Sequence, residues 1–240
     1  MRSTRDHFYG RWILANALAE GLGLGSTLLI GHYVIGGLHA TRPGAGAVLL
    51  GAVLAVAMGT VLEGALVGYM QGRVLTRREP RVTLGQWTLA TSVGAGLAWT
   101  LGMLPSTLAG LLAAPPIDAI AAAEPAGPPL WIVLPMALAM GALLGPLLAL
   151  MQWRLLRQVA RHAARWLAAN AAAWGLGMLV VFAGMAALSW SGSSARTAGA
   201  VFVVCSLAGA VVGAVHGRVL LRLLSQRGAA HGPSMPRSRH

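Results

Sequence analysis

The chain reads Gly64-Ala-Leu-Val-Gly68-Tyr-Met-Gln71-Gly72-Arg73-Val-Leu75 at the end of its second apolar run, and this stretch decides the fold because its pattern recurs. The recurrences align at Gly145, Ala149, Gln152, Arg154 and Leu156 and at Gly209, Gly213, His216, Arg218 and Leu220. A second motif, Trp followed four residues later by Asn or Thr, opens three other apolar runs at Trp12, Trp87 and Trp166. Agreement at this many positions predicts three tandem copies of one unit.

The composition around these motifs is that of a membrane protein. Hydrophobic residues make up 56% of the 240 residues and charged residues 10%, whereas soluble domains average about 45–50% and about 25%. A helix that crosses a bilayer needs about 20 apolar residues. We therefore expect an all-α membrane protein with six spans, at Trp12–Ile35, Ala45–Met70, Trp87–Leu104, Leu130–Met151, Trp166–Trp190 and Ala198–Val219.

The arginines predict the orientation of these spans. All 18 basic residues are arginines, and sixteen lie before the first span, between the second and third, between the fourth and fifth, or from the end of the sixth onward. Only Arg42 and Arg196 lie in the opposite loops. Because basic residues beside membrane spans are retained in the cytoplasm, we expect both termini there. The net charge of +12 is explained in this way without a nucleic-acid partner.

Each expected unit contains two spans, so every copy enters the membrane in the same orientation and the copies are parallel repeats. The boundaries are residues 1–82, 83–161 and 162–225 for the three hairpins, with an outside loop at 105–129 in the second. Residues 226–240 are rich in polar residues and are expected to form a disordered cytoplasmic tail. These units predict a pseudo-threefold helical bundle.

Glycines four residues apart share one helix face and let another backbone approach closely. Such glycines mark the second, fourth and sixth spans, at Gly64, Gly68, Gly72, Gly145, Gly209, Gly213 and Gly217. We expect these three spans to form an inner ring around the axis. The glycine-rich faces also suit a helix from a partner membrane protein or a tetrapyrrole pigment, and both alternatives stay open.

Six polar residues are expected at one depth, about one helical turn inside the cytoplasmic boundary. They are Asn16, Thr91 and Asn170 on the odd spans and Gln71, Gln152 and His216 on the even spans. One interpretation is a layer of hydrogen bonds between helices, each contributing about 0.6–2 kcal/mol. The other interpretation is a filter or a substrate-binding layer.

The aromatic and basic residues at the same boundary are expected to face the headgroup region. Indole rings prefer the membrane interface, so the three tryptophans that open the odd spans are predicted to be interfacial anchors. Arg73, Arg154 and Arg218 form the next layer, where an anion or an anionic lipid headgroup can bind. Cytoplasmic retention and snorkelling explain the same arginines without a ligand.

Two acidic residues, Glu20 and Glu63, interrupt the apolar spans of the first unit alone. Counting the helical rise from the cytoplasmic end places them about 12 and about 18 Å deep on adjacent helices. Acids at that depth are costly and usually face a protein interior or a water-filled cavity. Either the two acids share or relay a proton, or each is a neutral acid that hydrogen-bonds to a neighbouring helix.

No group of residues predicts a catalytic or metal centre. The histidines are dispersed, and no nucleophile, phosphate-binding or zinc-protease motif occurs. The single cysteine, Cys205, falls in the middle of a span and is expected to pack as a small apolar residue. We therefore expect neither an enzyme nor a metal protein, and the sequence indicates no cofactor.

The Gly-xxx-Gly-xx-Gln motif, followed by arginines and a tryptophan that opens the next span, resembles the repeats of multi-pass bacterial membrane proteins without a known activity. The resemblance covers the cytoplasmic half of all six spans and implies a location in the bacterial inner membrane. Mitochondrial carriers also consist of three hairpins. Their Pro-x-acid-xx-base motif is missing from the first, third and fifth spans, so we reject that relation.

Two functions from different classes are compatible with these features. The first is a non-catalytic scaffold, assembly factor or accessory subunit of a membrane complex, which sparse charge within the spans and the lack of a large outside domain favour. The second is a small proton- or cation-coupled transporter or channel that uses Glu20 and Glu63. We expect the first function.

Overall fold

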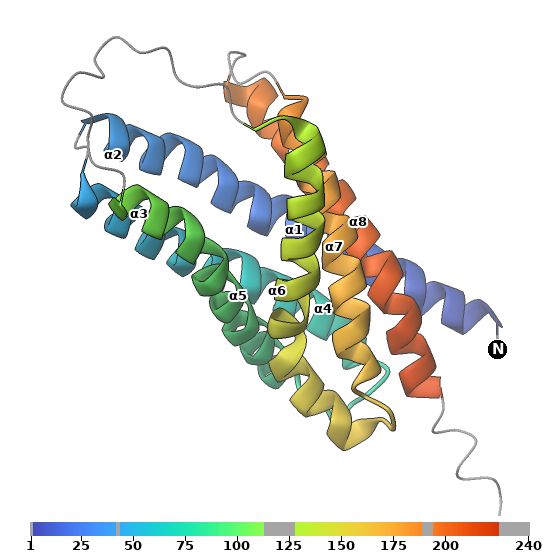
Figure 1. Cartoon of the computed structure of the whole chain (residues 1–240). Coiled ribbons are helices and arrows are strands. Elements are labelled where there is room, and N and C mark those ends of the chain that lie inside the picture. The colour runs from blue at the N-terminus through green and yellow to red at the C-terminus, as the bar shows by residue number, and fades with distance from the viewer. Residues whose placement is uncertain (1, 42–43, 113–127, 189–193, 226–240) are drawn as a thin grey trace, which may run out of the picture.

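The computed structural model of the protein describes residues 2–41, 44–112, 128–188 and 194–225 (Figure 1). Six helical segments in these ranges are long and apolar enough to cross a membrane, and we number them spans 1 to 6. They are Asp6–Leu38, Ala45–Leu75, Leu84–Leu112, Leu130–Val159, Arg165–Ala186 and Ser194–Ser225. The prediction of an all-helical chain is confirmed, and so is the number of helices that are long and apolar enough to span a membrane.

Two of the spans contain a π-helical segment, and the other four are single α-helices. Span 1 lies within α1 (Arg2–Ile30), the π-helical η1 (Gly31–Ile35) and α2 (Gly36–Thr41), which together extend beyond it at both ends. Span 2 consists of α3 (Ala45–Met58), the π-helical η2 (Gly59–Gly64) and α4 (Ala65–Leu75). Spans 3 to 6 are α5 (Leu84–Leu112), α6 (Leu130–Val159), α7 (Arg165–Ala186) and α8 (Ser194–Ser225).

The third and fifth spans differ from their predicted lengths. α5 runs through Pro105 to Leu112, whereas the sequence predicts an outside loop from residue 105 onward. Membrane helices tolerate proline because hydroxyl side chains, neighbouring helices and small local adjustments satisfy freed backbone groups, and α5 continues past Pro105 to Leu112. α7 ends at Ala186, before the predicted end of span 5. Residues 113–127 of the loop and the predicted tail lie outside the described residues.

The six spans form one closed ring in chain order. Each span packs against the next, and α1 packs against α8, which closes the ring. Every even-numbered span therefore lies between two odd-numbered spans, and within the described ranges α4, α6 and α8 do not pack face to face. The prediction of an inner ring made of spans 2, 4 and 6 is therefore wrong.

Glycines on the even-numbered spans explain this alternation. Each of three glycines packs on the backbone of a neighbouring odd-numbered span: Gly68 on Thr88, Gly145 on Asn170 and Gly209 on Asn16. A Cβ atom at any of these glycines would lie less than 3.0 Å from that backbone, so a larger residue would separate the helices. The other four predicted packing glycines, Gly64, Gly72, Gly213 and Gly217, have their nearest neighbours in α5 or α1. The faces predicted to receive a partner helix are thus covered within this chain.

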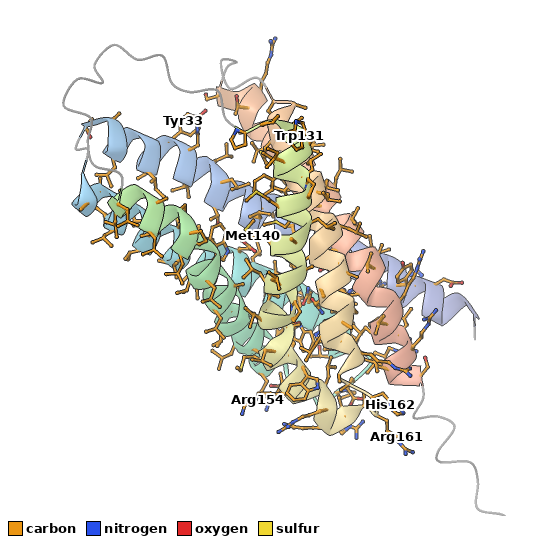
Figure 2. All side chains as sticks on the ribbon, in the orientation of Figure 1. Tyr33, Trp131, Met140, Arg154, Arg161 and His162 are labelled. Carbon is orange, nitrogen blue, oxygen red and sulfur yellow. The ribbon has the colours of Figure 1, made fainter. Side chains whose placement is uncertain are left out.

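Both ends of the described chain lie at the same end of the ring. α1 begins and α8 ends at the lower right of Figure 1. Arg154 and Arg161 lie at the lower end of the same view, and Tyr33 and Trp131 lie at the opposite end (Figure 2). We call the first of these the arginine end and the second the far end.

Candidate functional site: an intramembrane cavity with one carboxylate

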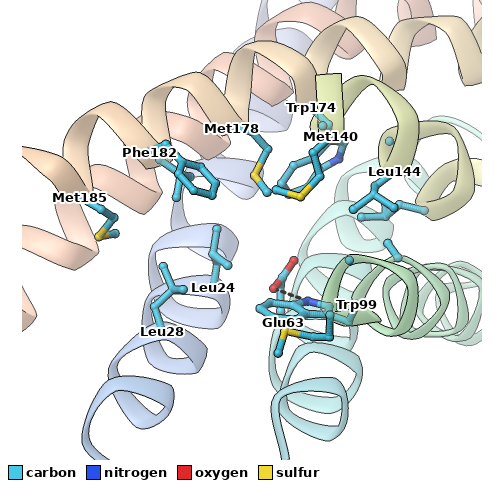
Figure 3. A pocket seen from close by; sticks show the side chains of 17 residues that line it. Leu24, Leu28, Glu63, Trp99, Met140, Leu144, Trp174, Met178, Phe182 and Met185 are labelled. Atoms are coloured by element: carbon cyan, nitrogen blue, oxygen red, sulfur yellow. Dashed lines mark hydrogen bonds between the residues drawn. The ribbon is translucent and has the colours of Figure 1, made fainter. Parts of the chain in front are cut away.

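A cavity of about 470 Å³ lies in the half of the ring toward the far end. Figure 1 shows spans 1 to 3 leaning away from spans 4 to 6 in that half, and residues from spans 1 to 5 form the cavity wall. The wall is almost entirely apolar and includes four methionines, Met103, Met140, Met178 and Met185. Its polar side chains are Glu63 and the indoles of Trp99 and Trp174, which Figure 3 shows around the space.

Glu63 is the acidic side chain of this wall, and Trp99 holds it. The Glu63 side chain comes from the π-helical η2 and is 4% exposed. Trp99 of α5 donates its indole Nε1–H to Glu63 Oε2 at 3.0 Å, the bond drawn in Figure 3. No arginine or histidine among the described residues lines the cavity, and the sequence has no lysine. The wall therefore offers the carboxylate one hydrogen bond and no opposite charge.

Gly59 makes room for the Trp99 ring. A Cβ atom at Gly59 would overlap the indole, so the ring lies directly on the Gly59 backbone. Gly59 begins η2, whose single wide turn also carries Glu63. π-helical turns inside α-helices are rare and often occur at functional sites. The same turn therefore supplies both the surface for the tryptophan and the carboxylate that it binds.

Glu20 lies close to Glu63 but does not line the cavity. The two residues come from adjacent spans, and Gly23, which lies about one helical turn after Glu20 in α1, packs on the backbone of Glu63. Glu20 is 1% exposed, and its Oε2 has no hydrogen-bond partner in the described part of the chain. On the other side, the Glu20 side chain packs against Gly209 of α8. The structure thus brings the two predicted acids together and gives only Glu63 access to the cavity.

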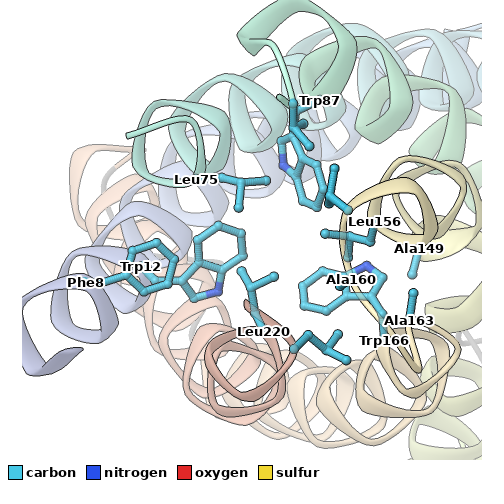
Figure 4. Packing of buried hydrophobic residues seen from close by; sticks show 13 residues of the cluster. Phe8, Trp12, Leu75, Trp87, Ala149, Leu156, Ala160, Ala163, Trp166 and Leu220 are labelled. Atoms are coloured by element: carbon cyan, nitrogen blue, oxygen red, sulfur yellow. The ribbon is translucent and has the colours of Figure 1, made fainter. Parts of the chain in front are cut away.

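Three tryptophans close the ring axis toward the arginine end. Trp12, Trp87 and Trp166 are each 0% exposed, and their ring centroids are 6.1 to 6.4 Å apart. The prediction that they are interfacial anchors is therefore wrong, because the indoles point inward (Figure 4). One leucine from each even-numbered span is buried with them: Leu75, Leu156 and Leu220. We call these six residues the tryptophan plug.

Hydrogen bonds explain why the three indoles leave the interface. Each donates its N–H to the even-numbered span beside it: Trp87 to Gln71 Oε1 at 3.1 Å, Trp166 to Gln152 Oε1 at 3.0 Å, and Trp12 to His216 Nδ1 at 3.1 Å. A buried indole N–H needs such a partner. The bonds connect span 2 to span 3, span 4 to span 5, and span 6 to span 1.

The six residues of the predicted polar layer lie beside the plug, and none is more than 4% exposed. Two glutamine amides in this layer bond to other spans. Gln71 Nε2 donates to Asn16 Oδ1 of span 1 at 2.8 Å. Gln152 Nε2 donates to Thr91 Oγ1 of span 3 at 2.8 Å and to Gln71 Oε1 of span 2 at 3.3 Å. Asn170 donates to the carbonyl of Trp166 on its own helix instead. Together, the polar layer and the tryptophan plug join the spans to one another in the half of the bundle near the arginine end.

The three arginines of the predicted anion site do not converge. Arg73, Arg154 and Arg218 are exposed on α4, α6 and α8, which do not pack on one another face to face in the described part of the chain. Arg73 donates to the hydroxyl of Tyr69 at 3.1 Å and lies over its ring. A single anion therefore does not contact all three, and each arginine faces the surroundings of the bundle separately.

The sequence reasoning missed Trp99, Gly59 and Trp174. The sequence does contain a signal for Trp99. Trp99 lies at a spacing of four residues, repeated, from Trp87 and Thr91, so the three side chains share one helix face. Thr91 on that face is predicted to point inward. The same spacing connects Asn170 to Trp174. Gly59 had no comparable signal, because the π-helical turn shifts its register relative to the other two units.

Comparison with protein-family models, with curated proteins and with solved structures finds no match to this chain. The chain is therefore described by its fold and its cavity. It is an all-helical chain with six candidate membrane spans, an axis closed at the arginine end and an apolar cavity with one carboxylate in its wall. Within the described ranges, no three His, Cys, Asp or Glu side chains come together as a metal site.

Proposed function

We propose that this chain is a non-catalytic integral membrane protein that binds one small, mostly apolar molecule in the cavity beside Glu63. The observation that carries the proposal is an apolar space of about 470 Å³ with one carboxylate in its wall. Ligand sites are typically concave spaces of about 300–1,000 Å³, lined by apolar and aromatic side chains and a few polar groups. The tryptophan plug closes one side of the axis, which favours a binding site over a continuous channel.

The architecture that we propose is three tandem hairpins, residues 1–82, 83–161 and 162–225, around a pseudo-threefold axis. Two observations support it: each plug tryptophan bonds to the corresponding residue of an even-numbered span, and the three ring separations are nearly equal. We also propose that the arginine end faces the cytoplasm of a bacterial inner membrane, because basic residues flank spans on that side. Exposed arginines such as Arg73 are then placed to bind anionic lipid headgroups.

The first unit departs from the other two where the cavity lies. The counterparts of Glu63 are Leu144 and Ala208, and those of Glu20 are Ala95 and Trp174. The cavity consequently has one polar side instead of three equivalent ones. A concave apolar wall that carries a single carboxylate is typical of a ligand site, in which a few polar groups orient a mostly apolar molecule.

Adjacent leucines of α6 allow a matched test of this proposal. Leu144 lines the cavity, whereas Leu143 is 72% exposed on the outer surface. The probe is 4-fluoroneopentylbenzene, followed by fluorine NMR with the protein in lipid nanodiscs and corrected with empty nanodiscs. We expect saturable binding of one probe per chain in the wild type and in Leu143→Trp, and loss of that binding in Leu144→Trp. Equal binding in the two variants would contradict the proposal.

A second function, a scaffold, assembly factor or accessory subunit, is favoured by the closed axis. A transporter that uses Glu20 and Glu63 requires a path past the tryptophan plug, and a structural subunit does not. Because the glycine faces are covered within the chain, a partner would contact the outer apolar surface instead. Purification from membranes at native expression tests this function: a stoichiometric partner protein supports it, and a monodisperse single chain contradicts it.

A further inference from the structure

We infer that the cavity ligand is a lipophilic monovalent organic cation, such as an aromatic amine or quaternary ammonium compound, whose positive charge lies beside Glu63. The inference rests on the proposed function and names the ligand class for that site. Three features of the cavity carry it: the charge of the wall, the aromatic rings in the wall and the position of the second acid.

The charge of the wall favours a positive ligand. Glu63 is the acidic residue among the lining side chains, and none of the lining residues is basic. An ionised carboxylate in an apolar membrane interior is costly unless an opposite charge accompanies it. Trp99 supplies one hydrogen bond to Oε2 and no positive charge. An organic cation supplies the missing charge, whereas an anion would be repelled.

The aromatic rings favour an organic cation with an apolar body. Phe182 and Trp174 lie across the space from Glu63 and Trp99 in Figure 3. The faces of such rings attract ammonium groups, most strongly where water is excluded. Methionine side chains complete the wall, and their flexible, polarisable thioethers adapt to ligands of different shape. A hydrated inorganic cation would find few oxygen ligands here, because such ions require several.

The position of Glu20 favours a single positive charge. Glu20 lies on the span next to Glu63 but does not line the cavity, and its Oε2 has no hydrogen-bond partner among the described residues. One monovalent cation balances the one carboxylate of the wall, and Glu20 lies outside that wall. Glutamine reproduces the shape and neutrality of a protonated glutamate. Glu20→Gln is therefore expected to bind the cation as the wild type does.

A pair of isosteric probes tests the ligand class. The 4-fluorobenzyltrimethylammonium ion and 4-fluoroneopentylbenzene have the same shape and differ in charge. We expect the wild type to bind the cation about tenfold or more tightly than the neutral probe, after correction for uptake by empty nanodiscs. In Glu63→Gln the affinity for the cation falls about tenfold or more, because the charged partner is lost. The affinity for the neutral probe stays unchanged, which also reports that the variant is folded.

The outcomes separate this inference from the proposed function. Equal affinity of the wild type for the two probes, or unchanged cation affinity in Glu63→Gln, would overturn the inference while binding in the cavity stands. Absence of saturable binding of either probe would overturn both. If Glu63→Gln does not fold, Glu63→Asp retains the charge, and the comparison of the two probes in the wild type still decides the ligand class.

Discussion

Trp99 and Glu63 come from neighbouring spans and meet in the cavity wall, where the indole N–H donates to the carboxylate at 3.0 Å and the ring lies on Gly59. The pair joins α5 to the π-helical turn of span 2. It therefore fixes both the orientation of the carboxylate and one wall of the cavity. The first two predictions test the two halves of this arrangement.

Trp99→Phe removes the hydrogen bond to Glu63 and keeps an aromatic ring. We expect the free energy of unfolding to fall by about 1–3 kcal/mol, because a buried carboxylate loses its donor. The measurement is denaturant unfolding of the purified protein in mild detergent. Trp131→Phe is the control, since Trp131 is 75% exposed, and an equal effect in the two variants would argue against the bond.

Gly59→Ala places a Cβ atom where the Trp99 ring lies. We expect the ring to shift and stability to fall by about 1–3 kcal/mol, as for other overpacked interiors, despite the gain of about 1 kcal/mol that alanine brings to a helix. Gly199→Ala is the matched control, because a Cβ atom at Gly199 meets no neighbour within 4 Å. A Gly59→Ala variant as stable as Gly199→Ala would show that the ring does not occupy this position.

Gln152 and Trp166 test the hydrogen bonds beside the plug. A double-mutant cycle with Gln152→Leu and Trp166→Phe isolates their 3.0 Å bond between α6 and α7. We expect a coupling energy of about 0.6–2 kcal/mol, the range of hydrogen bonds between membrane helices. Unfolding of the four proteins in detergent measures this energy. Strict additivity of the two single changes would contradict a direct bond.

Membrane orientation is tested by labelling single cysteines. The background is Cys205→Ala, because Cys205 is the one native cysteine and is buried. Gln158→Cys lies at the arginine end and Ala195→Cys at the far end, and both positions are exposed. We expect a membrane-impermeant maleimide added to whole cells to label position 195 alone, because basic flanks stay in the cytoplasm. Labelling of position 158 from outside would reverse the proposed orientation.

Hydropathy was sufficient to predict the six spans but not their ends. The spans are long apolar runs between arginines, and a lipid environment leaves few alternatives to helices for such runs. The predicted third span ends at Leu104, one residue before Pro105. In the structure α5 passes through it. The π-helical turn at Gly59 was not predictable either, because no local pattern marks it and the residue that packs on Gly59, Trp99, comes from another helix.

The inward-facing positions of the polar layer were predictable from the sequence. The prediction for the three plug tryptophans was wrong. Asn16 was expected to face other helices, and Trp12 lies one turn before it on the same face. This spacing places the indole on the axis, where His216 accepts its N–H. The general preference of indole for the membrane interface was given more weight than the helical face. The cavity depends on how spans 1 to 3 lean away from spans 4 to 6, which no local pattern encodes.

The central claim is that the cavity holds a cationic ligand against Glu63. The most direct measurement is a bromine anomalous difference map from crystals grown with the 4-bromobenzyltrimethylammonium ion. We expect a peak inside the cavity, in contact with residues such as Leu144 and Met178, with the ammonium group directed toward Glu63. A peak confined to the outer surface of the bundle, or a cavity filled by side chains with no peak, would contradict it.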